Sequence, residues 1–136
     1  MQKKLSSTLL MLLFLFIAAA CRKNDDCADC APSRTDLLGT WTVTQTNEQG
    51  AQFDVELTFN QDNTFLWEVT DTSSGHISTS AAYALSNEIL TFKSDPDCNF
   101  DGLYYVYLKG NKLAIMLRED SCAPRVQGLE WVWTRK

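Results

Sequence analysis

The sequence predicts an all-β fold over residues 37–136, an eight-stranded antiparallel up-and-down barrel. From Gly39 onward apolar and polar residues alternate with a period of two, which is typical of half-buried strands, most strictly over residues 53–59. Short turn sequences rich in Asn, Gly and Ser separate these runs. The expected strands cover residues 41–43, 53–59, 65–69, 77–85, 89–92, 103–108, 113–117 and 129–133. No convincing helix is expected after residue 20.

Eight hairpin-linked strands with one apolar face can form either a sandwich or a closed barrel. Closure removes the exposed strand edges that invite association with other chains. The short connections between neighbouring strands favour the barrel, because Greek-key crossings need longer ones.

Residues 1–20 have the three-part pattern of a secretory signal peptide. Lys3 and Lys4 give a positive start, residues 9–20 form an apolar run, and Ala18–Ala20 are small residues of the kind found before a cleavage site. The run is too short for a bilayer core, which needs ~20 residues. A buried helix is the alternative, but nothing polar interrupts the run to give it a solvated face. We therefore expect export.

A cysteine follows the small residues. The segment 17–21, Ile-Ala-Ala-Ala-Cys, resembles the lipobox of bacterial lipoproteins, with Ala18 where Leu is commoner. This resemblance implies that Cys21 becomes an acylated N-terminus, and two or three acyl chains suffice for stable membrane anchoring. Residues 21–36 lack periodicity and are interpreted as a flexible tether. Residues 22–26 (RKNDD) also resemble a signal for the outer face of the outer membrane; chance charges in a linker are the alternative.

The charge of the mature chain argues against nucleic acid as a partner. Removal of residues 1–20 takes away Lys3 and Lys4, which leaves ten Lys and Arg against 17 Asp and Glu, a side-chain charge of −7. An acidic domain repels phosphate backbones, and no Lys/Arg cluster offsets this. The expected partners are the membrane, through Cys21, and either a small apolar ligand or an envelope protein, with the domain monomeric.

Four cysteines remain besides Cys21, an even number that suits disulfides in an oxidising compartment. Cys98 and Cys122 each lie twelve residues from Gly110 in the sixth expected turn, so an antiparallel hairpin would place them opposite each other. We expect them to be bonded; two unpaired buried thiols are the alternative. Cys27 and Cys30 have C-x-x-C spacing, for which a local disulfide is preferred because no helix follows to support redox chemistry.

Short motifs in residues 37–136 resemble lipocalin-like lipoproteins. Leu38-Gly39-Thr40-Trp41 opens the first strand like the Gly-x-Trp signature of lipocalins, and the last strand ends in Trp133-Thr134-Arg135. The resemblance implies that Gly39, Trp41 and Arg135 meet where the barrel closes, with Arg135 packed on a Trp ring. Asn63 stands where this family often has Gly, a tolerable exchange because Asn also accepts left-handed backbone.

The inward positions of the expected strands carry many aromatic rings. They are Trp41, Phe53, Phe59, Phe65, Trp67, Tyr83, Phe92, Trp131 and Trp133. In carriers such rings line a ligand pocket, whereas in a small eight-stranded barrel they fill the middle. Strands of about seven residues with this aromatic bulk favour the filled interior.

No constellation in the sequence predicts catalysis, a metal or a cofactor. The one histidine, His76, lies in a Ser/Gly-rich stretch, and Asp54 and Glu56 fall on the outward face of a strand. The acidic residues 95–101 have the spacing of a calcium loop but lack its Gly and its Glu. We therefore expect a non-enzymatic binding domain; the alternative is a structural or envelope-interaction module with a filled barrel and no ligand.

Overall fold

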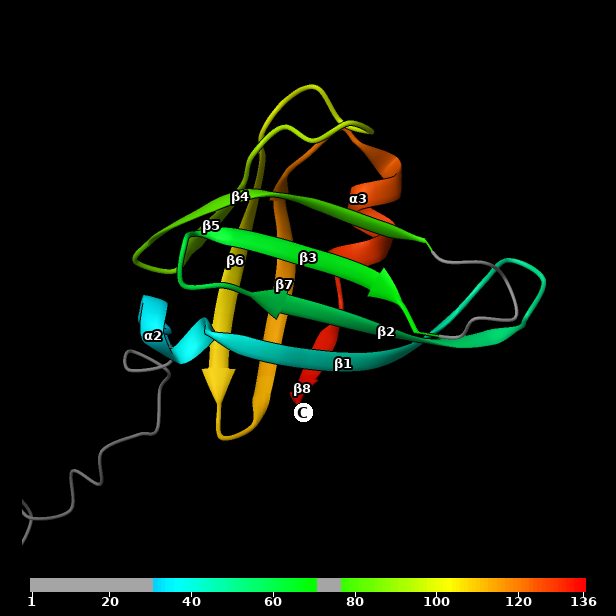
Figure 1. Ribbon diagram of the computed structural model, residues 1–136, viewed down its shortest axis with the longest axis horizontal. Helices are drawn as coiled ribbons and strands as arrows, with labels where there is room; N and C mark the ends of the chain where they lie inside the picture. Colours follow the sequence, from blue (N-terminus) through cyan, green and yellow to red (C-terminus); the bar gives the residue numbers. More distant parts are fainter. Residues whose placement is uncertain (1–30, 71–76) are drawn as a thin grey trace, which may run out of the picture.

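Each strand pairs with the next along the chain, and the last pairs with the first, in a closed antiparallel barrel (Figure 1). The computed structural model describes residues 31–70 and 77–136. The strands are β1 (Gly39–Thr46), β2 (Gln52–Phe59), β3 (Thr64–Val69), β4 (Ser78–Ser86), β5 (Ile89–Phe92), β6 (Gly102–Lys109), β7 (Lys112–Glu119) and β8 (Val132–Arg135). Two short helices, α2 (Arg34–Leu37) and α3 (Ala123–Leu129), accompany them. The prediction of an all-β, eight-stranded barrel is confirmed.

The centre of the barrel is filled by side chains from the inward positions of the strands. The largest fully buried ones are Trp41, Trp133, Tyr104, Phe59, Phe65 and Phe92. Several of the rings meet edge to face, as the charge distribution of aromatic rings favours. The ring of Phe92 lies 4.7 Å from that of Phe65 and 5.5 Å from that of Tyr104, centroid to centroid.

The barrel closes between β1 and β8. Trp41 stands opposite Arg135 in the register, and the Arg135 Cζ lies 4.1 Å from the centre of the Trp41 ring. Arg135 Nη1 also donates to the carbonyl of Leu38 at 2.9 Å. Gly39 begins β1 with a φ of +108°, a conformation that side chains strongly disfavour. The contact implied by the family resemblance is therefore present in the structure.

The two ends of the barrel differ in what covers them. The α2 end comprises α2 and the turns 60–63, 87–88 and 110–111, and Asn63 there has the left-handed φ of +63° that its position requires. The α3 end comprises α3, the turn 47–51, the loop 93–101 and the described residues that flank 71–76. Figure 1 shows α2 beside the start of β1 and α3 beside the far end of β7.

Both helices correct the sequence-based interpretation. Residues 34–36 were expected in the tether, but Ser33 and Asp36 form a capping box that starts α2. Residue 129 was expected in the last strand, whereas it ends α3, and β8 begins only at Val132. Helix α3 has only seven residues, and its Leu129 continues the alternation of Trp131 and Trp133, so the pattern does not separate the helix from the strand.

Candidate functional site

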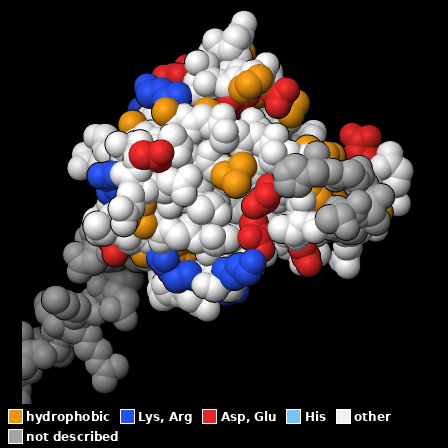
Figure 2. All heavy atoms as spheres, viewed as in Figure 1, with side chains coloured by type: hydrophobic (Ala, Val, Ile, Leu, Met, Phe, Trp, Pro, Cys, Tyr) orange, Lys and Arg blue, Asp and Glu red, His pale blue; other side chains and the backbone are white. Residues whose placement is uncertain are grey.

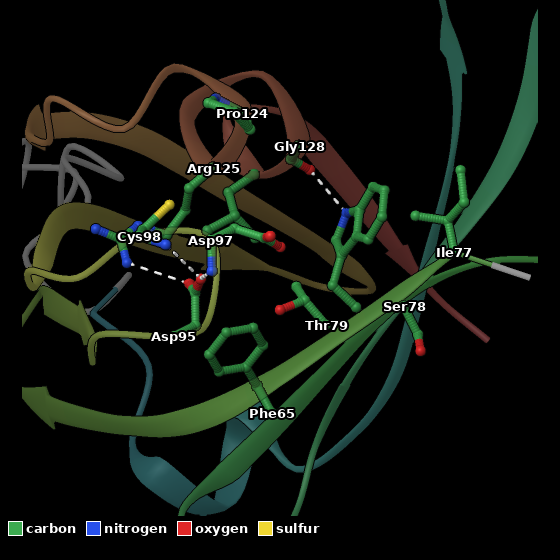
Figure 3. Close-up of a pocket in the computed structure, with 12 residues that line it drawn as sticks. Phe65, Ile77, Ser78, Thr79, Asp95, Asp97, Cys98, Pro124, Arg125 and Gly128 are labelled. Atoms are coloured by element: carbon green, nitrogen blue, oxygen red, sulfur yellow. Dashed lines mark hydrogen bonds and ion pairs between the residues drawn. The ribbon is translucent and has the colours of Figure 1, made fainter.

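A pocket of about 210 Å³ opens at the α3 end of the barrel (Figure 3). One wall is formed by β3 and the start of β4, including Phe65, Trp67 and Thr79. The facing wall combines the loop 93–101 with α3. Figure 3 shows Asp95, Asp97 and Arg125 on one side of this space, with Phe65 and Thr79 across from them.

Helix α3 is held against the barrel through one backbone carbonyl. The Gly128 oxygen accepts hydrogen bonds from Trp67 Nε1 at 3.1 Å and from the buried Gln45 Nε2 at 3.0 Å. A Cβ at position 128 would lie 3.4 Å from Trp67 Nε1, an ordinary van der Waals contact, so the indole packs directly against this point of the helix. The indole of Trp67 thus both lines the pocket and fixes the helix that forms its opposite wall.

A buried ionic cluster supports the pocket from behind. The Arg125 side chain, 4% exposed, donates from Nε to Asp120 Oδ2 at 2.6 Å and from Nη2 to Asp120 Oδ1 at 3.1 Å. Nη1 donates to Asp95 Oδ2 at 3.3 Å. The carbonyls of Lys93 and Phe100 accept the remaining N–H groups. All five N–H donors of this guanidinium are therefore engaged within the protein.

Asp120 is the acceptor at the centre of the cluster. It takes a 2.6 Å hydrogen bond from the Tyr104 hydroxyl in addition to those from Arg125. Burial by itself would raise the pKa of Asp120, but the hydrogen bonds from Arg125, Tyr104 and the Cys122 N–H lower it below its usual value. The pKa of Tyr104 is raised by burial and by its bond to Asp120. Both groups are therefore held in a single protonation state near neutral pH.

Gly102 provides the space for this carboxylate. A Cβ at position 102 would overlap Asp120 Oδ2 and lie 2.9 Å from Arg125 Nε. The sequence-based interpretation missed Gly102, Tyr104, Asp120 and Arg125 as one unit, since they belong to different segments. Asp95 was noted only as part of a calcium-like pattern; its carboxylate instead accepts from Arg125 and from the N–H groups of Asp97 and Cys98.

The disulfide lies beside this cluster. Cys98 and Cys122 are bonded, with their Cα atoms 5.9 Å apart, and both are buried, which confirms the predicted pairing. The two residues lie beyond the hairpin itself, because the β6–β7 register ends at Leu103 opposite Glu119. Cys98 belongs to the loop 93–101, and Cys122 is the N-cap residue of α3. The bond therefore ties the two segments that form one wall of the pocket.

A family comparison agrees with this architecture. The family model described as a lipocalin-like domain matches residues 37–115, more than half of the chain. The chain belongs to the lipocalin-like domain family. Searches of curated proteins and of solved structures found no match. The matched region of the lipocalin-like domain includes Trp41 and the whole barrel wall up to the middle of β7, whereas Arg125 and α3 lie outside it.

The structure distributes the predicted interior residues of the lipocalin-like domain over the packed centre, the pocket and the edge of the wall at the α3 end. Trp41, Phe59, Tyr83, Phe92 and Trp133 are buried in the packed centre. Phe65 and Trp67 reach the pocket.

Two of these residues lie where the wall reaches the α3 end. Phe53 and Trp131 are half-buried there and pack against the core. Phe53 borders a wide surface hollow of about 350 Å³ beside Asp54 and Thr70. Trp131 donates from Nε1 to the carbonyl of Gln127 in α3 at 2.7 Å.

Other predicted site residues lie outside the described part of the chain. These are the signal peptide 1–20, the lipidation residue Cys21, the pair Cys27 and Cys30, and His76. Within residues 31–70 and 77–136, no group of three His, Cys, Asp or Glu side chains is placed to hold a metal ion. No helix in these same ranges is long and apolar enough to cross a membrane.

Proposed function

We propose that the protein is an exported lipoprotein whose lipocalin-like domain binds a small, largely apolar ligand without catalysis. The observation that carries this proposal is the pocket of about 210 Å³ at the α3 end, where the rings of Phe65 and Trp67 and the side chain of Leu129 meet. Concave, mainly apolar surfaces with a few polar groups are typical of small-molecule sites. Thr79 and Asp97 supply such polar groups here.

The size of the pocket limits the ligand. It exceeds the ~150 Å³ of a cavity that holds benzene, and it is smaller than the ~300 Å³ at which drug-sized pockets begin. The Trp41, Phe92 and Trp133 side chains occupy the centre of the barrel and are fully buried. We therefore infer a ligand of about one ring with a short substituent, held at the mouth rather than inside the barrel.

The anchoring part of the proposal rests on the sequence. The signal-peptide pattern and the Ile-Ala-Ala-Ala-Cys segment support acylation of Cys21. Residues 22–26 support placement at the outer membrane. The binding part and the anchoring part are independent, because the pocket lies within residues 65–129.

Filling the pocket tests the binding function. Thr79→Phe places a ring in the space between β4 and α3, whereas Ala84→Phe adds the same ring at an exposed position of the same strand. One-ring fragments should shift the NMR signal of the Trp67 indole N–H in the native protein and in Ala84→Phe, and should fail to do so in Thr79→Phe. Unchanged binding in Thr79→Phe, with the fold verified by circular dichroism, would refute the pocket as the site.

A second candidate function is contact with an envelope protein through the outer face of β6, β7 and β8. Met116 and Val132 are 51% and 58% exposed there. Tyr105 pairs with Met116, and Ala114 pairs with Val132, so these side chains form one apolar surface. Loss of a co-purifying envelope protein in Met116→Lys, with ligand binding unchanged, would favour this function.

A further inference from the structure

The two ends of the barrel carry opposite side-chain charge. For the α3 end, we count the described carboxylates that lie in a loop or within two residues of a loop. They are Glu48, Glu68, Asp95, Asp97, Asp101, Glu119, Asp120 and Glu130. The cations there are Lys93, Arg118 and Arg125, which leaves a charge of −5 for the described residues. The same count at the α2 end gives five cations against three carboxylates (Arg34, Lys109, Lys112, Arg135 and Lys136; Asp36, Asp62 and Glu88).

None of the three cations at the α3 end is available to a ligand in the pocket. Arg125 lines the pocket, but each of its N–H donors already has a protein acceptor. Lys93 forms an ion pair with Asp101 at 2.8 Å. Arg118 lies on the outer face of β7, with its Cζ 5.6 Å from the Tyr105 ring centre.

Among the contacts of residues 31–70 and 77–136, the carboxylate of Asp97 differs from its neighbours in having no polar partner. Both oxygens of Asp95 accept hydrogen bonds from Arg125 or from backbone N–H groups, and Asp120 is buried beneath Arg125. Asp97 lines the pocket and is exposed, and among the described contacts its side chain accepts no hydrogen bond and forms no ion pair. Across the pocket stand Phe65 and Trp67, whose ring faces attract cations. Figure 2 shows separate Asp and Glu side chains on the visible face, with Lys and Arg side chains also exposed there.

We propose that the pocket selects a ligand that carries an amine cation on its apolar body, and that it rejects carboxylates of the same shape. This inference rests on the proposed binding function and names the ligand's charge. A mouth of one sign concentrates ligands of the opposite sign. An anionic ligand would lose its water shell without gaining a cation, because the guanidinium of Arg125 is already occupied.

Three probes with one body and different charge test the inference. They are 3-phenylpropylamine, 3-phenylpropan-1-ol and 3-phenylpropionate, titrated into the mature protein at pH 8, where histidines are neutral. If the protein is acylated, zwitterionic nanodiscs hold it. At low salt the amine should bind at least tenfold more tightly than the carboxylate, with the alcohol between them. The amine's advantage should shrink as salt is raised, because the charges at the mouth are exposed.

A matched pair of variants locates the effect. Asp97→Asn should weaken amine binding about two- to fivefold, the range of an exposed ion pair, and leave alcohol binding unchanged. Glu88→Gln removes the same charge at the α2 end. It should change neither amine binding nor alcohol binding. Carboxylate binding as tight as amine binding would overturn this inference alone. Absence of binding by all three probes would overturn it together with the proposed function.

Discussion

Arg125 illustrates how a single residue organises this protein. Its guanidinium joins Asp95 in the loop 93–101, Asp120 at the end of β7 and its own helix α3. Removing one partner of a buried ion pair costs about 3–5 kcal/mol, because the remaining charge is left without compensation. The cluster is therefore a positioning device for the pocket wall, and its five occupied donors explain why it does not serve as an anion site.

The pH dependence of stability should report on Asp120. Its pKa is lowered in the folded state, so the unfolded chain takes up the proton first as the pH falls below the usual value of 3.8. The stabilisation by ionised Asp120 is complete above pH 5 and is lost as the pH falls through the folded pKa. Urea unfolding from pH 6 to pH 2 should give a shallower acid slope for Asp120→Asn than for the native protein.

Asp97→Asn is the control for this measurement, since Asp97 is exposed and outside the cluster. The change in acid slope should be larger for Asp120→Asn than for Asp97→Asn. An unchanged slope in Asp120→Asn would show that other carboxylates account for the acid sensitivity. Asp36, Asp62 and Asp101 also have lowered pKa values through hydrogen bonds from Ser33, Thr64 and Lys93, so some slope remains in every variant.

Among the elements, β8 is the one whose pairing completes the barrel. It is four residues long and meets β1 at only two register positions, Trp41 opposite Arg135 and Thr42 opposite Thr134. Arg135 strengthens this short β1–β8 pairing through its contact with the Trp41 ring and its hydrogen bonds to the carbonyls of Leu38 and Asp36. The β1–β8 pairing therefore depends on side-chain contacts more than the longer strand pairings of the barrel do.

A double-mutant cycle should measure this dependence. Trp41→Ala should lower the free energy of unfolding by about 3–5 kcal/mol, because a buried aromatic ring leaves a cavity. Arg135→Lys keeps the charge but loses the flat stacking surface, so it should also destabilise. The coupling between the two should be about 0.5–2 kcal/mol, the range of cation–π contacts. Arg118→Lys, at an exposed stack on Tyr105, is the control; zero coupling at Arg135 would contradict the assigned role of this contact.

At the scale of the whole molecule, the two ends of the barrel differ in charge. The chain enters the described region at Ala31, just before α2, and the basic residues Lys109, Lys112 and Lys136 belong to that same end. The pocket and most carboxylates belong to the other end. An anchor at Cys21 would therefore be joined to the domain at its α2 end, opposite the end that holds the pocket.

Substitution of Cys21 tests the proposed anchor. Cys21→Ser should abolish acylation and release the protein from the membrane fraction as a soluble or unprocessed species, whereas Cys30→Ser should leave fractionation unchanged. Mass spectrometry of the mature N-terminus and membrane fractionation are the measurements. A Cys21→Ser protein that still carries lipid would refute the anchor assignment.

Local patterns were sufficient to predict the barrel. A strand with one buried face has a period of two, and a short turn brings the next strand alongside, so residues 53–59 and the turn at 110–111 could be interpreted without long-range information. Cys98 and Cys122 could be paired for the same reason, since their distances from Gly110 are equal. Helix α3 could not be recognised, because it has only seven residues and its last residue, Leu129, continues the alternation of Trp131 and Trp133.

By itself, the sequence predicted the strand order and the disulfide and favoured the filled interior, because each follows from side-chain period and turn position. Only the tertiary structure decided where the pocket lies and what surrounds it. The Arg125 cluster joins residues up to 32 positions apart, and the carbonyl of Gly128 accepts from Gln45, 83 positions away. Such contacts depend on how an irregular segment packs across the barrel end. No local periodicity encodes that packing, since hydrogen bonds and ion pairs in loops have no repeating spacing.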